Sequence, residues 1–153
     1  MWRMVTRAGR VGLLFALIHF LPAIASAQIS VSLLKVNKLS QPHGISPDVA
    51  PVLSWVISSE EHNTVQAAYE IDVTSGGKSV WRSGRVKSDN SAFVRYEGPL
   101  SSDTRYDWTV RVWDNRGNVS RKASGSWSTG LRPCDWHAKW IGKVGDPTPV
   151  KFR

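Results

Sequence analysis

Cysteine is scarce in this sequence, and its scarcity excludes an internal disulfide. Cys134 is the only cysteine among 153 residues, so a folded domain must be held together by its apolar core. A cysteine nucleophile would need a histidine base close to it in space. His137 lies three residues away, but nothing else suggests a catalytic triad. We therefore interpret Cys134 as an inert, partly buried thiol and predict no catalytic residue here.

Patterns that mark metal, phosphate or nucleic-acid binding are also absent. The sequence contains no Cys-x-x-Cys or His-x-x-x-His pair, and Gly76-Gly77 separates two apolar runs instead of opening a helix. The net charge is +8, but no basic run is longer than Arg121-Lys122. Nucleic-acid binding requires a basic stripe on one face. These absences predict no metal, no cofactor and no nucleic-acid partner.

The first 27 residues have the order of segments that is typical of a secretory signal peptide. Arg3, Arg7 and Arg10 form a basic start, residues 11–24 are apolar except for His19, and Ala25-Ser26-Ala27 supplies small residues for cleavage. A retained membrane anchor is the alternative, but a membrane-spanning helix needs about 20 apolar residues and this segment is shorter. We therefore predict cleavage after Ala27 and a secreted or periplasmic product that is free of the membrane.

Short apolar runs separated by turn residues follow this segment, and helical periodicity is absent. In one run, Tyr69, Ile71 and Val73 alternate with polar residues, so one face of that strand is apolar. Seven strands are expected, over residues 29–36, 52–57, 66–75, 79–83, 91–96, 104–114 and 122–129. Seven short strands within about 100 residues predict an all-β fold, a fibronectin III or immunoglobulin-like β-sandwich.

The segments between and after these strands set the expected boundaries. We expect a loop over residues 84–90, and we expect Val31 and Leu33 to share one face of the first strand. The sandwich is expected to span residues 28–131. Residues 132–153 are proline-containing and mostly polar, which predicts a linker that ends in the first strand of an absent following domain. That reading implies a truncated chain.

Seven motifs occur in a fixed order along the predicted sandwich and just after it. They are Pro51-Val52-Leu53-Ser54-Trp55, Gln66-Ala67-Ala68-Tyr69-Glu70-Ile71-Asp72-Val73, Val80-Trp81-Arg82-Ser83-Gly84-Arg85-Val86, Val94-Arg95-Tyr96-Glu97-Gly98, Thr104-Arg105-Tyr106-Asp107-Trp108-Thr109-Val110-Arg111-Val112-Trp113-Asp114, Trp127-Ser128-Thr129-Gly130-Leu131 and Asp135-Trp136-His137-Ala138-Lys139-Trp140-Ile141-Gly142. In this order they resemble the N-terminal fibronectin type III-like domain of bacterial α-L-rhamnosidases.

This resemblance implies a part of a large glycoside hydrolase that removes terminal α-linked L-rhamnose. The catalytic acid and base of such enzymes belong to an (α/α)6 barrel far downstream, and no position here matches them. Glu70 and Asp72 lie about 7 Å apart on one strand face, inside the window of about 6.5–9.5 Å found in inverting glycosidases. Two parallel side chains cannot flank a sugar ring, so we interpret them as an exposed polar face.

Tryptophan is abundant, with eight residues in the chain. Trp55 and Trp108 fall on core-facing positions, and the hydroxyl of Tyr106 is expected to hold a loop as in a tyrosine corner. Four others are expected to pack against downstream domains of a parent rhamnosidase, since exposed apolar patches mark partner surfaces: Trp81, Trp113, Trp136 and Trp140.

A free-standing carbohydrate-binding or adhesive module is the alternative function. Flat aromatic faces match the apolar faces of sugar rings, and rhamnose-containing glycans would then be the ligands. The sequence assigns no substrate-binding residue.

Overall fold

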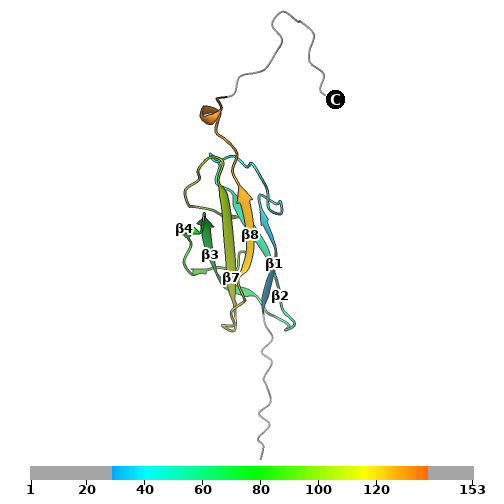
Figure 1. Ribbon diagram of the computed structural model, residues 1–153. Helices are drawn as coiled ribbons and strands as arrows, with labels where there is room; N and C mark the ends of the chain where they lie inside the picture. The colour runs from blue at the N-terminus through cyan, green and yellow to red at the C-terminus, as the bar shows by residue number, and fades with distance from the viewer. Residues whose placement is uncertain (1–28, 138–153) are drawn as a thin grey trace, which may run out of the picture.

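The computed structural model of the protein describes residues 29–137 (Figure 1). The predicted signal peptide with its cleavage site at Ala27, the predicted interface residue Trp140 and the strand expected at the end of the chain lie outside the described residues. No helix in the described part is long and apolar enough to cross a membrane.

Two antiparallel sheets face each other and form a β-sandwich (Figure 1). The three-stranded sheet has the order β1 (Ser30–Val36), β2 (Val52–Ser58) and β6 (Val94–Arg95). The five-stranded sheet has the order β4 (Lys78–Arg82), β3 (Gln66–Ser75), β7 (Arg105–Asp114) and β8 (Ala123–Ser128), and β5 (Val86–Lys87) also pairs with β3. A single 3-10 turn, η1 (Pro133–Asp135), follows β8. The predicted all-β sandwich is confirmed.

The pairing of β3 with β7 shows how the alternating sequence builds the core. Ile71 lies opposite Val110 and Val73 lies opposite Trp108, and all four side chains are buried. The intervening residues, such as Asp72 opposite Thr109, point to the outer face of the sheet. The apolar face predicted for residues 66–75 is therefore confirmed.

Aromatic side chains fill much of the space between the sheets. Trp55, Trp108 and Trp127 are buried, as expected for the first two. The Trp55 Nε1–H donates to Gln66 Oε1 at 2.9 Å, which satisfies the polar end of that indole. The Tyr106 hydroxyl accepts the backbone N–H of Ser101 at 2.8 Å. This bond holds the loop before β7, as predicted from the tyrosine corner.

Two local predictions were wrong. Val31 and Leu33 do not share a face, because the β1–β2 register shifts between Ser32 and Lys35. An irregularity of this kind moves later side chains to the other face, so Leu34 packs toward the core while Leu33 is 67% exposed. The segment 84–90, expected to be a loop, contains β5, which pairs with Ala68 and Tyr69 of β3.

Tyr96 lies at the centre of the aromatic cluster and is fully buried. Its ring meets Trp81 edge-on at 5.2 Å and Trp127 edge-on at 5.4 Å between centroids. Its hydroxyl donates to the carbonyl of Pro99 at 3.0 Å. Burial, with a smaller contribution from nearby Tyr106, raises the pKa of Tyr96 to about 12.

This shift predicts that the sandwich loses stability in alkali. The phenol ionises more easily in the unfolded chain, whose pKa is the ordinary value of 10.0. The stabilisation is therefore fully present below pH 10 and is lost as the pH rises toward about 12. Urea unfolding over this range should show the midpoint falling more steeply in the native protein than in Tyr96→Phe. Parallel pH profiles would contradict this assignment.

Candidate functional site

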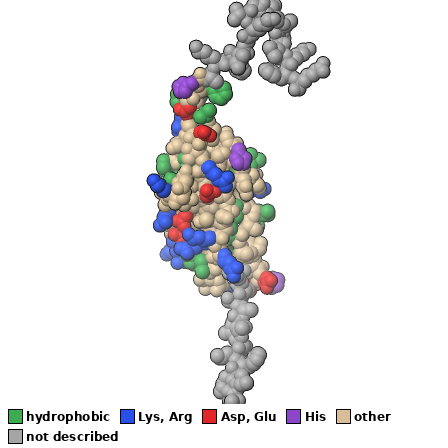
Figure 2. Space-filling model, viewed as in Figure 1, with side chains coloured by type: hydrophobic (Ala, Val, Ile, Leu, Met, Phe, Trp, Pro, Cys, Tyr) green, Lys and Arg blue, Asp and Glu red, His purple; other side chains and the backbone are tan. Residues whose placement is uncertain are grey.

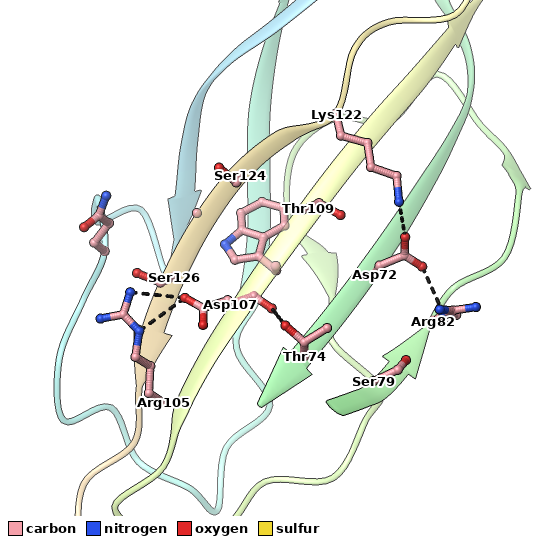
Figure 3. Close-up of a pocket in the computed structure, with 13 residues that line it drawn as sticks. Asp72, Thr74, Ser79, Arg82, Arg105, Asp107, Thr109, Lys122, Ser124 and Ser126 are labelled. Atoms are coloured by element: carbon pink, nitrogen blue, oxygen red, sulfur yellow. Dashed lines mark hydrogen bonds and ion pairs between the residues drawn. The ribbon is translucent and has the colours of Figure 1, made fainter. Parts of the chain in front are cut away.

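Acidic and basic side chains lie close to one another on the face of the molecule seen in Figure 2. On the outer face of the five-stranded sheet, hydroxyl side chains lie among them (Figure 3). Outward positions on neighbouring strands gather there because residues two apart on a strand share one face. They line an open depression of about 480 Å³, which we call the polar groove. Its main polar lining residues are Asp72, Thr74, Arg82, Arg105, Asp107, Thr109, Lys122, Ser124 and Ser126.

Basic side chains engage both carboxylates of the polar groove (Figure 3). The Lys122 Nζ donates to Asp72 Oδ2 at 2.6 Å, and Arg82 Nε lies 3.4 Å from Asp72 Oδ1. The Arg105 guanidinium donates to Asp107 Oδ1 from Nε at 3.2 Å and from Nη2 at 3.1 Å. These contacts are structural ion pairs between strands or along one strand.

The same arrangement does not form a glycosidase centre. Asp72 and Asp107 lie on adjacent strands, β3 and β7, and both point from one face of the sheet. Glycoside hydrolysis needs two carboxyl groups that flank the scissile bond. Glu70, the other carboxylate considered from the sequence, is bound by Arg111 Nε at 2.6 Å. The described carboxylates of this face are therefore components of ion pairs.

Trp113, one of the predicted interface residues, also lies on this outer face and is half-buried. Two guanidinium groups lie over its ring, that of Arg85 at 4.4 Å and that of Arg111 at 5.0 Å from the ring centroid. Such cation–π contacts stabilise the aromatic ring in place. The structure thus uses Trp113 within the domain, through arginines that sequence reasoning did not connect to it.

The other described interface candidates lie elsewhere. Trp81 lies opposite Val73 in the β3–β4 ladder and packs toward Tyr96 in the core, so it is on the face opposite Trp113. Trp136 follows η1 and is 63% exposed. The structure does not bring Trp81 and Trp113 onto one surface. Their role in contacting another domain stays a prediction, as does that of Trp136.

Arg132 holds the end of the sandwich from which the chain leaves β8. Its Nε donates to Asp48 Oδ1 at 2.8 Å, its Nη1 donates to Ser102 Oγ at 3.1 Å, and its Nη2 donates to the Leu100 carbonyl at 3.1 Å. Its backbone N–H donates to Asp135 Oδ2 at 3.1 Å. We call this set the Arg132 clamp. It ties the first residues of the predicted linker to two loops of the sandwich.

The charges of the clamp reinforce it. The Asp48 carboxylate raises the pKa of Arg132. Hydrogen bonds from the Ser102 hydroxyl and the Arg132 backbone hold the pKa of Asp135 below its ordinary value. Both shifts favour the charged forms that make these contacts. The sequence offered no sign of this clamp, because long stretches of chain separate Arg132 from Asp48, Leu100 and Ser102.

Removing the clamp should loosen the chain after β8 without unfolding the sandwich. The amide of Asp135 donates to the Arg132 carbonyl at 3.0 Å. In Arg132→Ala this amide should exchange its hydrogen roughly tenfold faster, since a segment can open locally while the rest of the domain stays folded. Arg132→Lys keeps the charge but loses the forked geometry, so its exchange rate at Asp135 should lie between those of the native protein and Arg132→Ala. Unchanged exchange at Asp135 in Arg132→Ala would show that the clamp does not fix this turn.

Cys134 is exposed, so the predicted partial burial was wrong. Its Sγ lies 3.7 Å from Asp135 Oδ1 because the short turn η1 places the thiol beside a carboxylate instead of an apolar surface. Within residues 29–137, no three His, Cys, Asp or Glu side chains are grouped so that they could hold a metal ion.

The fold and motifs place this chain in a known family. The family model described as the Rha78A-like, N-terminal immunoglobulin domain matches residues 31–133. The chain belongs to this family. The resemblance drawn from the ordered motifs is thereby confirmed.

Its relatives are much longer proteins. An α-L-rhamnosidase of Streptomyces avermitilis is 41% identical over 124 residues, which cover 75% of this chain and 12% of the relative. An α-L-rhamnosidase of Formosa agariphila is 35% identical over 134 residues, covering 77% of this chain and 13% of the relative. The crystal structure of the Streptomyces avermitilis α-L-rhamnosidase complexed with L-rhamnose superposes with a TM-score of 0.69 at 38% identity, over 74% of this chain and 12% of that chain.

Proposed function

We propose that this chain is a non-catalytic N-terminal accessory module of an α-L-rhamnosidase, a glycoside hydrolase that releases terminal α-linked L-rhamnose. The match to the N-terminal immunoglobulin domain of such enzymes over residues 31–133 carries the proposal. The share of the relatives that this chain spans, 12–13%, also supports a module of a larger enzyme.

The geometry of the outer face supports the non-catalytic part. Asp72 and Asp107 are engaged by basic side chains and point from the same sheet face, so they cannot act from opposite sides of a glycosidic bond. Hydrolysis would then belong to the domains that follow in a parent enzyme. The module would pack against those domains, and the Arg132 clamp would fix the direction in which the chain leaves it.

The expected location follows from the first 27 residues. Their basic, apolar and small segments support export and cleavage after Ala27. The mature module would then act in the periplasm or outside the cell, where rhamnose-containing glycans are encountered. Mass spectrometry of the exported protein should find Gln28 as its first residue, and a retained Met1 would contradict cleavage.

Two proteins test the proposed function together. The isolated chain should release no chromophore from an aryl α-L-rhamnoside above the spontaneous rate. A chimera in which residues 29–137 replace the matching segment of the Streptomyces avermitilis enzyme should hydrolyse the same substrate. The core of residues 29–137 is self-contained, so the graft carries a complete fold. Hydrolysis by the isolated chain, or a chimera that is inactive although the parent is active, would contradict the proposal.

The polar groove favours a second candidate function, the binding of rhamnose-containing glycans. Its volume of about 480 Å³ falls within the range of about 300–1,000 Å³ that is usual for ligand sites, and its hydroxyl and charged groups can pair with sugar hydroxyls. Titration with such glycans should shift the amide resonances of Thr109 and Ser124, and Lys122→Ala should weaken the effect. Shifts confined to other faces, or none at millimolar sugar, would reject this function.

A further inference from the structure

The outer face of the three-stranded sheet carries large apolar side chains in an unfavourable backbone conformation. Leu33 has a φ of 49° and Phe93 has a φ of 57°, both in the left-handed region that bulky residues avoid. Their side chains are 67% and 61% exposed, so packing within the domain does not compensate for the strain. Strained residues of this kind are concentrated at functional sites.

The two side chains flank the central strand of that sheet. In β2, Leu53 and Trp55 are buried, while the side chain of Val56 points outward and is 46% exposed. Val56 lies opposite Ser32, the residue before Leu33. The backbone N–H of Phe93 donates to Ser54 Oγ at 3.2 Å, on the same outward side of β2. We call Leu33, Val56 and Phe93 the β2 patch.

Basic residues surround the β2 patch. Lys35 lies opposite Ser54, and Arg95 lies opposite Val52, so both point outward. The Lys38 Nζ lies 5.6 Å from the centre of the Phe93 ring. β1, β2 and β6 contain no acidic residue; the nearest acids along the chain are Glu60, two residues after β2, and Glu97, two residues after β6.

These features select one occupant. A second copy of this chain would place Lys35, Lys38 and Arg95 against the same basic residues, and like charges across an interface are repulsive. An apolar surface with an acidic rim would match both the apolar side chains of the β2 patch and the basic residues around it. The domains that follow in a parent enzyme would supply such a surface, because this segment matches only 12% of the Streptomyces avermitilis relative.

We propose that the β2 patch docks onto an acidic-rimmed apolar surface of the following domains of the parent α-L-rhamnosidase. This inference rests on the proposed function. It assigns the contact to the three-stranded sheet and leaves the polar groove of the opposite sheet exposed. It also explains the conformations of Leu33 and Phe93, since docking removes from water the side chains that the left-handed backbone turns outward.

Thiol labelling tests the assignment. In a Cys134→Ser background, single cysteines are placed at Leu33, Phe93, Ser124 and Trp136, in the isolated chain and in the chimera defined above. Labelling is followed on the corresponding peptides by mass spectrometry. Positions 33 and 93 should react at least tenfold more slowly in the chimera, while position 124 in the polar groove should react equally in both proteins. Equal rates at 33 and 93 in the two proteins would overturn the proposal.

The four labelled positions distinguish a failure of this inference from a failure of the proposed function. Protection at position 136 without protection at 33 and 93 would keep the module in the enzyme but reject the β2 patch. Absence of protection at all four positions, with an inactive chimera, would reject both. Labelling at 33 that slows as the isolated chain is concentrated would indicate a second copy as the occupant and would also overturn the proposal.

A pair of substitutions gives an independent readout. Asparagine accepts the left-handed conformation better than bulky apolar residues do, so Leu33→Asn and Phe93→Asn should leave the melting temperature of the isolated chain unchanged or raised. In the chimera the same changes should shorten the half-life at elevated temperature by about threefold or more, whereas Ser124→Asn should not. An unchanged half-life for the two patch variants would contradict docking through Leu33 and Phe93.

Discussion

Replacing Gly98 with alanine should destabilise the sandwich by about 3 kcal/mol, the upper end of the usual range for overpacking a core. A Cβ at this position would lie 2.3 Å from the Tyr96 hydroxyl oxygen, 2.5 Å from Tyr96 Cζ and 2.6 Å from Trp81 Cβ. Tyr96 cannot move away easily, because it is fully buried and its hydroxyl is bound to the Pro99 carbonyl. The melting temperature should fall by roughly 10–20 °C for a domain of this size.

Gly76 provides the matched control. It has a φ of +54°, and no atom lies within 4 Å of the position that a Cβ would occupy. Gly76→Ala therefore tests backbone strain without a clash and should lower the free energy of unfolding by about 1 kcal/mol. Thermal unfolding of both variants compares the two effects directly. If Gly98→Ala were no more destabilising than Gly76→Ala, the close packing of Tyr96 and Trp81 around Gly98 would be wrong.

Truncating Trp127 to alanine should have the largest effect, a loss of about 4 kcal/mol in the free energy of unfolding. The indole is buried, stacks on Tyr106 at 5.2 Å and 14°, and meets Tyr96 edge-on at 5.4 Å. Its removal leaves a cavity beside the two tyrosines that hold the adjoining loops. Since domains of this size are stable by about 5–15 kcal/mol, the variant should be close to unfolding at ordinary temperature.

Trp136→Ala is the control with the same chemical change. Trp136 is 63% exposed, so its loss should alter the urea midpoint of the isolated chain very little. Trp127→Phe should cost less than Trp127→Ala, because it keeps an aromatic ring and removes an indole N–H that is buried without a partner. Equal midpoints for the two alanine variants would contradict the placement of Trp127 in the core.

The core could be predicted from the sequence because it depends on local alternation. Ile71 and Val73 occupy every second position of one strand, and this period alone indicates a shared face. Tyr106 and Trp108 follow the same period in β7, and both are buried as expected. The bond from Ser101 to the Tyr106 hydroxyl also spans only five residues, so a known local motif was sufficient to find it.

Features that depend on tertiary contacts could not be predicted in this way. The bond from Arg132 to Asp48 joins residues 84 positions apart, and no local pattern shows that their loops meet at one end of the sandwich. Trp113 was assigned to an interface because its position alternates away from the core. Its contact with Arg85 depends on how the segment after β4 crosses the sheet, which the period of β7 does not report.

Leu33 illustrates a third kind of failure. Its apolar side chain fits a regular strand, so alternation placed it beside Val31. The register shift between Ser32 and Lys35 reverses the faces, and neither glycine nor proline marks it in the sequence. The β2 patch could therefore be recognised only after the conformations of Leu33 and Phe93 were known.

Heat inactivation tests most directly whether this chain is an accessory module of an α-L-rhamnosidase. Three proteins are compared: the Streptomyces avermitilis enzyme, a variant that lacks its matching N-terminal segment, and the chimera that carries residues 29–137 of this chain. We predict that deletion shortens the half-life of aryl α-L-rhamnosidase activity by about tenfold or more and that the chimera recovers most of this loss. A chimera that inactivates as fast as the deletion variant would contradict the proposed function.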